Sequence, residues 1–142
     1  MRWPYLSTED YHIRQHISEW YMRDMPTVVE IGPNGNGVKV SGHYRAIDWL
    51  SEAPDDIGRP YGLVYLGVDI EGGEEEIAAF HHLVRGASVC VIEAATDYPV
   101  GSRQMREVIA TSRMEVVARF EIYLPDHGEH SARSMVVLRS EQ

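Results

Sequence analysis

The feature that most constrains the fold is a short apolar run that ends abruptly in a glycine-rich turn, in the segment 27–37 with the sequence TVVEIGPNGNG. The run is rich in β-branched residues and is bounded by Pro26 and Gly32, which is typical of a strand buried on both faces. Such strands belong mostly to parallel sheets that are covered by helices on both faces. A glycine-rich turn after the first strand is where open α/β sheets bind ligands. The segment therefore predicts an α/β fold with a binding edge beside this turn.

The rest of the chain alternates between helical and strand patterns. Apolar residues at helical spacing, with capping and stop signals, predict helices over 9–25, 74–86 and 102–112. Uninterrupted apolar runs predict two further buried strands, over 61–70 and 88–93. We therefore expect a single domain over 1–142, with an N-terminal helical segment at 1–26.

Two other segments complete the expected sheet. Strict alternation predicts a half-buried strand over 113–124, which a turn joins to a closing strand over 134–139 as an antiparallel hairpin. The segment 43–50 fits either a short helix or a second strand that ends at Asp48.

Net charge and cysteine content limit the substrate classes and the cellular location that we expect. The chain has 13 basic against 22 acidic residues and a single lysine, Lys39, whereas binding to a phosphate backbone needs clustered basic residues. We therefore expect a small-molecule substrate and no nucleic acid. No apolar run reaches the roughly 18 residues that span a bilayer, and the N-terminus lacks the apolar core of a signal peptide. Cys90 is the single cysteine and lies in an apolar run, which predicts that its side chain fills space in the core. With no second cysteine for a disulfide, we expect a cytoplasmic protein with no membrane partner.

The histidines do not form a metal site by spacing. His81 and His82 are adjacent and diverge on the predicted helix, and His127 and His130 flank a turn. No spacing matches a zinc site, so we expect no metal.

The segment 27–37 resembles the first motif of S-adenosylmethionine-dependent methyltransferases with a Rossmann-like fold. That motif is an apolar strand, an acidic residue, any residue and a glycine, and then a glycine-rich turn; Glu30, Ile31 and Gly32 match its opening. The next two glycines of the motif would fall at Asn34 and Asn36, whereas this chain has glycines one position later. Either one residue is inserted, or asparagine replaces glycine, since asparagine tolerates left-handed backbone.

The end of the chain also resembles this family, because a strand, a helix and an antiparallel hairpin form its usual ending. On that alignment 61–70 is the fourth strand and 88–93 the fifth, so one strand–helix unit is missing or reduced. The resemblance implies a single Rossmann-like domain, with a mainly parallel sheet flanked by helices and closed by a C-terminal antiparallel hairpin. It also implies S-adenosylmethionine as cofactor and methyl transfer to a small molecule.

The resemblance assigns cofactor-binding roles to the turn and to two acids. The turn residues are Glu30, Gly32, Pro33, Asn34 and Gly35. Asp48 lies 18 residues after Glu30, near the spacing of about 20 residues that places a ribose-binding acid; it also fits an exposed helix aspartate. Asp69 would face the acceptor if 61–70 is the fourth strand, would bind the ribose if it is the second, or would cap the following turn.

A catalytic base is needed only if the acceptor must lose a proton. The candidates are His43, His81 and Tyr98. His81 shares a helical face with Ile77 and so also fits a buried core histidine, whereas Tyr98 follows strand 88–93 at the ligand edge.

Two other functions fit the same residues. A reduced domain could act as a methyltransferase-like binding or assembly module without catalysis, or could use S-adenosylmethionine for a reaction other than methylation. A reduced sheet also leaves an edge or face uncovered, which proteins usually bury. We therefore expect a homodimer or higher oligomer, formed by the aromatic N-terminal helix across a two-fold axis. The alternative is a monomer in which this helix folds back on its own sheet.

Overall fold

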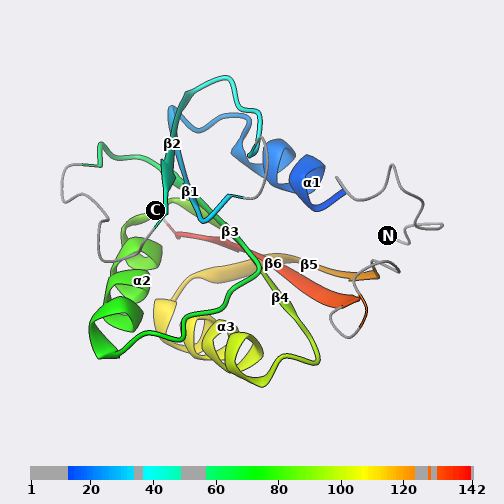
Figure 1. Cartoon of the computed structure of the whole chain (residues 1–142). Coiled ribbons are helices and arrows are strands. Elements are labelled where there is room, and N and C mark those ends of the chain that lie inside the picture. The colour runs from blue at the N-terminus through cyan, green and yellow to red at the C-terminus, as the bar shows by residue number, and fades with distance from the viewer. Residues whose placement is uncertain (1–12, 34–36, 49–56, 124–127, 129–130, 142) are drawn as a thin grey trace.

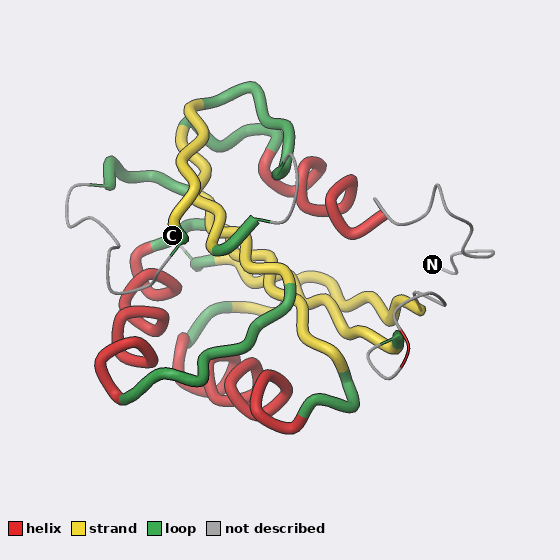
Figure 2. The backbone as a smooth tube through the Cα atoms, viewed as in Figure 1, coloured by secondary structure: helices red, strands yellow, loops and turns green. Residues whose placement is uncertain are grey.

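The computed structural model describes residues 13–33, 37–48, 57–123, 128 and 131–141. These residues form three helices and six strands (Figures 1 and 2), which in chain order are α1 (Ile13–Met22), β1 (Thr27–Ile31), β2 (His43–Ile47), β3 (Gly62–Leu66), α2 (Glu74–Gly86), β4 (Val89–Ala95), α3 (Pro99–Ser112), β5 (Glu115–Tyr123) and β6 (Ala132–Arg139).

The strands form one six-stranded sheet in the order β2-β1-β3-β4-β6-β5. The first four strands in this order are parallel to one another. β6 is antiparallel to both of its neighbours, β4 and β5, and a bulge between Val116 and Ala118 interrupts the register of β5. A mainly parallel sheet closed by a C-terminal antiparallel hairpin, as predicted from the sequence, is therefore confirmed.

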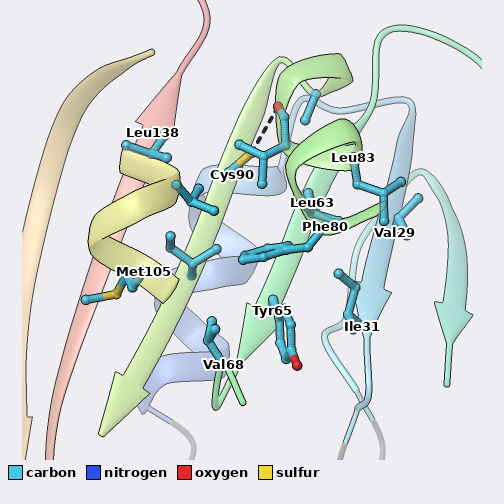
Figure 3. Packing of buried hydrophobic residues seen from close by; sticks show 14 of the residues in the cluster. Val29, Ile31, Leu63, Tyr65, Val68, Phe80, Leu83, Cys90, Met105 and Leu138 are labelled. Atoms are coloured by element: carbon cyan, nitrogen blue, oxygen red, sulfur yellow. Dashed lines mark hydrogen bonds between the residues drawn. The ribbon is translucent and has the colours of Figure 1, made fainter. Parts of the chain in front are cut away.

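Helices cover the two faces of the sheet unequally. α2 and α3 lie on one face, and α1 lies on the other (Figure 1). The larger core fills the space under α2 and α3, where Phe80 is fully buried and meets the ring of Tyr65 edge-on at 5.4 Å between centroids (Figure 3). Cys90 is fully buried in the same core, as the sequence predicts.

The segment 43–50, which fitted a helix or a strand, forms a strand in its described part. β2 pairs with β1 along its whole length, from Thr27 opposite His43 to Ile31 opposite Ile47. Asp48 therefore follows the carboxyl end of β2 directly.

Three element boundaries differ from the sequence prediction by three residues or more. The strand expected over 61–70 ends at Leu66, because Gly67 has a φ of 85° and turns the chain out of the strand. The helix expected over 102–112 begins earlier, at Pro99, where proline suits the first helical position. The helix expected over 9–25 ends at Met22, and the predicted start over 9–12 lies outside the described residues.

The segment between β1 and β3 is shorter than in a complete Rossmann-like domain. The connection from β1 to β2 contains no helix in its described parts, 32–33 and 37–42. Between β2 and β3 the described residues, 48 and 57–61, add no strand. These observations agree with a missing or reduced strand–helix unit in this part of the chain.

Candidate functional site

The sheet has a topological switch point between β1 and β3. The chain leaves β1 toward β2 on one side, and the next strand, β3, lies on the opposite side of β1. Ligands of open α/β sheets bind outside the carboxyl ends of the strands at such a point. Glu30, Gly32 and Asp48 lie on or just after the carboxyl ends of β1 and β2, and Asp69 lies in the loop that follows β3.

Glu30 connects β1 to the far end of the glycine-rich turn. Its side chain is buried, with 2% of its surface exposed, and alternation along β1 directs it to the α1 face. Its Oε1 accepts hydrogen bonds from the backbone N–H of Val38 at 2.9 Å and from the hydroxyl of Tyr44 at 2.7 Å. Burial, together with the Glu30 carboxylate, raises the pKa of Tyr44, so this hydroxyl stays a donor. Glu30 therefore fixes where the turn returns to the sheet.

The turn depends on glycine at Gly37. Its φ is 69°, and a side chain there would collide with the Tyr44 hydroxyl and lie 3.1 Å from Oε1 of Glu30. The close packing leaves no room for any other residue type. Sequence reasoning placed the binding residues earlier in the turn, and Asn34 and Gly35 lie outside the described residues.

Gly32 starts the turn with a φ of 55°, and its N–H donates to the carbonyl of Ile47 at 2.8 Å. Among the described residues, a side-chain carbon built on Gly32 would have no neighbour within 4 Å. Pro33 follows and is half-buried, and the exposed Asp48 follows Ile47 on the adjacent strand. The structure therefore brings Gly32, Pro33 and Asp48 together at the edge of β1 and β2.

Asp69 lies in the loop between β3 and α2 and is not at the strand end. Its Oδ1 lies 2.8 Å from the hydroxyl of Tyr98, and Oε1 of Glu71 lies 2.8 Å from the same hydroxyl. These two hydrogen bonds raise the pKa of Tyr98, since they stabilise its protonated form. At neutral pH Tyr98 is therefore a hydrogen-bond donor at this edge.

Gln104 of α3 positions the same loop and was missed by sequence reasoning. It accepts from the N–H of Ile70 at 2.9 Å and donates to the carbonyl of Ile70 at 2.6 Å. Gly101, one turn earlier, allows the carbonyl of Val68 to approach the helix. The signal was present in the sequence: Gln104 is a polar residue next to the inward-facing Met105.

The other two candidate bases lie away from the carboxyl edge. His43 is the first residue of β2, and its N–H donates to the carbonyl of Pro26 at the amino end of the sheet. Nδ1 of His81 lies 3.2 Å from the hydroxyl of Thr111 on α3. Thr111 is twelve residues beyond Pro99, about 18 Å along a helix that begins at the carboxyl edge.

Sequence analysis also did not identify a second buried acid near the carboxyl edge of the sheet. Glu93 of β4 is completely buried, and its two carboxylate oxygens bond different arginines. Oε2 accepts from Nη1 of Arg14 on α1 at 3.1 Å, and Oε1 accepts from Nη1 of Arg133 on β6 at 2.8 Å. In an apolar run expected to be buried on both faces, an acid is the sequence signal for such a pairing.

The described residues contain no group of three or more His, Cys, Asp or Glu side chains arranged to hold a metal ion. Within the same part of the chain, no helix has the length and hydropathy needed to cross a membrane.

Comparison with known proteins supports the fold. No protein-family model and no curated protein sequence match the chain. TrmK from M. capricolum, solved with S-adenosylhomocysteine, matches 96% of this chain and 70% of its own, with a TM-score of 0.56 and 11% identity. A protein of the NADB-Rossmann superfamily from Streptococcus agalactiae matches 96% of this chain and 69% of its own, with a TM-score of 0.53 and 13% identity.

The methyltransferase domain of bacterial CtHen1-CN matches 92% of this chain and 95% of its own, with a TM-score of 0.51 and 9% identity. At these identities the likeness is one of fold, and it agrees with the resemblance noted in the segment 27–37. The chain therefore has the Rossmann-like fold of S-adenosylmethionine-dependent methyltransferases.

Proposed function

We propose that the protein binds S-adenosylmethionine and transfers its methyl group to a small-molecule acceptor. The observation that carries this proposal is Glu30, which holds a glycine-rich turn at the switch point of a sheet with the methyltransferase fold. A similar solved structure, TrmK, contains S-adenosylhomocysteine. The net charge of −9 favours a small acceptor over a nucleic acid.

The residues at this edge divide into two groups. Gly32 and Pro33, with Asn34 and Gly35 next to them in the sequence, hold the cofactor, and Asp48 accepts hydrogen bonds from its ribose hydroxyls. Asp69, in the loop after β3, and Tyr98, which contacts it, lie on the acceptor side.

S-adenosylmethionine supplies an activated methyl group when bound. The protein must then hold the acceptor lone pair in line with that methyl group, and orientation alone supplies several kcal/mol of such a barrier. The hydroxyl proton of Tyr98 is shared between the carboxylates of Asp69 and Glu71, so Tyr98 holds Asp69 in position beside the acceptor. If the acceptor must lose a proton, Asp69 is the adjacent carboxylate that can accept it.

Replacing Asp48 with alanine is expected to weaken binding of S-adenosylhomocysteine by about 10-fold or more, because hydrogen bonds to a charged group contribute about 1.5–3 kcal/mol. Isothermal titration measures this for the wild type and the variant. Asp24→Ala removes an exposed acid before β1 and should leave the affinity unchanged. A folded wild-type protein that gives no heat with millimolar S-adenosylmethionine or S-adenosylhomocysteine contradicts the proposed function.

A second candidate is a binding module without catalysis. The short connection from β1 to β2, which has no helix in its described part, favours it because less protein surrounds the ligand there. Mass spectrometry of reaction products separates the two, and it also detects any use of S-adenosylmethionine other than methylation.

We also propose that the protein is a homodimer through the outer face of α1. Trp20 on this helix is 60% exposed, and the guanidinium of Arg23 lies 3.9 Å from the centre of its ring. Trp20→Glu should yield a protein of half the mass in light scattering, since an unpaired charge buried in an interface costs several kcal/mol. Tyr123→Glu, on the exposed part of β5, is the matched control and should remain dimeric. If Tyr123→Glu gives a monomer and Trp20→Glu remains dimeric, the interface lies on β5. A monomeric wild type would exclude the dimer.

A further inference from the structure

The loop between β3 and α2 carries the two carboxylates that bond Tyr98. Burial alternates along this loop: Val68 and Ile70 are only 1% and 6% exposed and belong to the core under α2 and α3. Asp69 and Glu71, which alternate with them, are exposed. Since alternate residues of an extended segment point to opposite sides, the two acids lie on the same side of the loop. Both carboxylates therefore reach the hydroxyl of Tyr98, each at 2.8 Å.

The start of this loop is fixed by β4 and by α3. The main-chain oxygen of Glu93 on β4 accepts hydrogen bonds from the N–H groups of Gly67 and Val68, both at 2.8 Å. The carbonyl oxygen of Val68 in turn packs against α3 at Gly101, where any side chain would collide with it. The backbone that precedes Asp69 is therefore held from two sides.

Gln104 of α3 holds the backbone on the other side of Asp69. Its Oε1 accepts from the N–H of Ile70 at 2.9 Å, and its Nε2 donates to the carbonyl of the same residue at 2.6 Å. Gln104 is 3% exposed, so both bonds lie inside the protein. α3 is itself tied to the end of β4, because the hydroxyl of Ser102 donates to the carbonyl of Ala95 at 2.8 Å. One buried amide thus pairs both polar groups of one backbone residue.

We propose that Gln104 is a positioning residue for the acceptor side of the site: it fixes the backbone of Ile70 and thereby holds two carboxylates at the hydroxyl of Tyr98. These carboxylates belong to Asp69 and Glu71, which flank Ile70 in the sequence, so a displacement of its backbone moves both of them. The loop is therefore in place before an acceptor binds. The assignment to the acceptor rests on the proposed methyl transfer, whereas the contact between Gln104 and the loop does not.

Ionisation of Tyr98 tests this proposal without cofactor or acceptor. Hydrogen bonds to Asp69 and Glu71 raise the pKa of Tyr98. Up to about pH 11, one unit above the ordinary tyrosine pKa of about 10, we therefore expect the wild type and Tyr98→Phe to form the same amount of tyrosinate, measured by its absorbance. Gln104→Met keeps the length of the side chain but loses both bonds to Ile70. It should form about one tyrosinate more than the Gln104→Met/Tyr98→Phe double variant.

Val108→Ala is the matched control on the same helix. Val108 is buried in the core under α2 and α3, so the variant loses stability but no hydrogen bond to the loop. It should keep Tyr98 protonated, as in the wild type, with circular dichroism showing that each protein stays folded. The proposal is wrong if Tyr98 ionises normally in the wild type. It is also wrong if folded Gln104→Met and Val108→Ala proteins, each compared with its own Tyr98→Phe version, form the same excess of tyrosinate.

Amide hydrogen exchange provides a second test that needs only the wild type. The N–H of Ile70 should exchange as slowly as the N–H groups inside β3, because its acceptor is a buried side chain. Exchange at the rate of an unprotected peptide amide would show that Gln104 does not fix the loop, and would overturn the proposal even if Gln104→Met failed to fold.

Cofactor binding is measured separately, by isothermal titration with S-adenosylhomocysteine. Gln104→Met should leave this affinity unchanged, since the loop serves the acceptor side. A folded Gln104→Met protein that loses the affinity assigns the loop to the cofactor and overturns the proposal. If the wild type does not bind S-adenosylhomocysteine, the proposed methyl transfer fails, while the ionisation of Tyr98 still decides whether Gln104 fixes the loop.

Discussion

Glu93→Ala is expected to lower the free energy of unfolding by about 3–5 kcal/mol, the usual cost of removing one partner from a buried ion pair. The alanine variant leaves the guanidinium groups of Arg14 and Arg133 mostly buried without the carboxylate that they share. It also leaves a cavity beneath α1. Urea denaturation of the wild type and the variant measures the difference.

Two further variants show whether the cost comes from unpaired charge. Glu75→Ala removes an exposed acid from the first turn of α2 and should cost no more than about 1 kcal/mol. Replacing all three charged residues together, as Arg14→Met, Glu93→Leu and Arg133→Met, should recover most of the lost stability, because apolar replacements of a buried ion cluster are often neutral. If the triple variant is as unstable as Glu93→Ala, lost packing and not lost pairing explains the effect.

Glu30→Ala is expected to reduce both stability and cofactor binding. It removes the acceptor of the Val38 N–H, and Val38 is only 4% exposed, so a buried donor is left without a partner at a cost of about 1–3 kcal/mol. The turn between Gly32 and Gly37 then loses its connection to β1. We expect the affinity for S-adenosylhomocysteine to fall by at least about 10-fold, which corresponds to about 1.4 kcal/mol.

Tyr44→Phe is the matched control for Glu30→Ala. It removes one hydrogen bond to Glu30 and leaves the bond from Val38 intact, so it should cost only about 0.5–1.5 kcal/mol. Calorimetric titration and urea denaturation of both variants test the comparison. If Tyr44→Phe weakens cofactor binding as much as Glu30→Ala does, the role of Glu30 in ordering the turn is wrong.

The sequence predicted the elements whose signal is local. The apolar run before Gly32 and the alternating residues of β5 indicate strands without reference to the rest of the chain. The segment 43–50 could not be assigned, because Tyr44 and Ile47 are three residues apart and fit a helix as well as a strand. Pairing with β1 decides the outcome, and that pairing is a tertiary contact.

The candidate site was predicted where one segment carries it and missed where distant segments meet. Glu30 and its turn were identified from a single stretch of eleven residues. Glu93, in contrast, bonds arginines 79 and 40 residues away, so its partners could not be read from the sequence. The position of Asp69 was misjudged for a simpler reason: the chain leaves β3 at Gly67, earlier than the apolar run suggests.

The single cysteine has a practical consequence for measuring the stability of this molecule. Cys90 is fully buried in the core under α2, and burial raises the pKa of its thiol. A thiol reagent needs access to a thiolate, so it can modify Cys90 only in molecules whose core has opened. The rate of thiol modification therefore reports the population of open molecules without any denaturant. The protein contains its own probe of unfolding, at one defined position in the sheet.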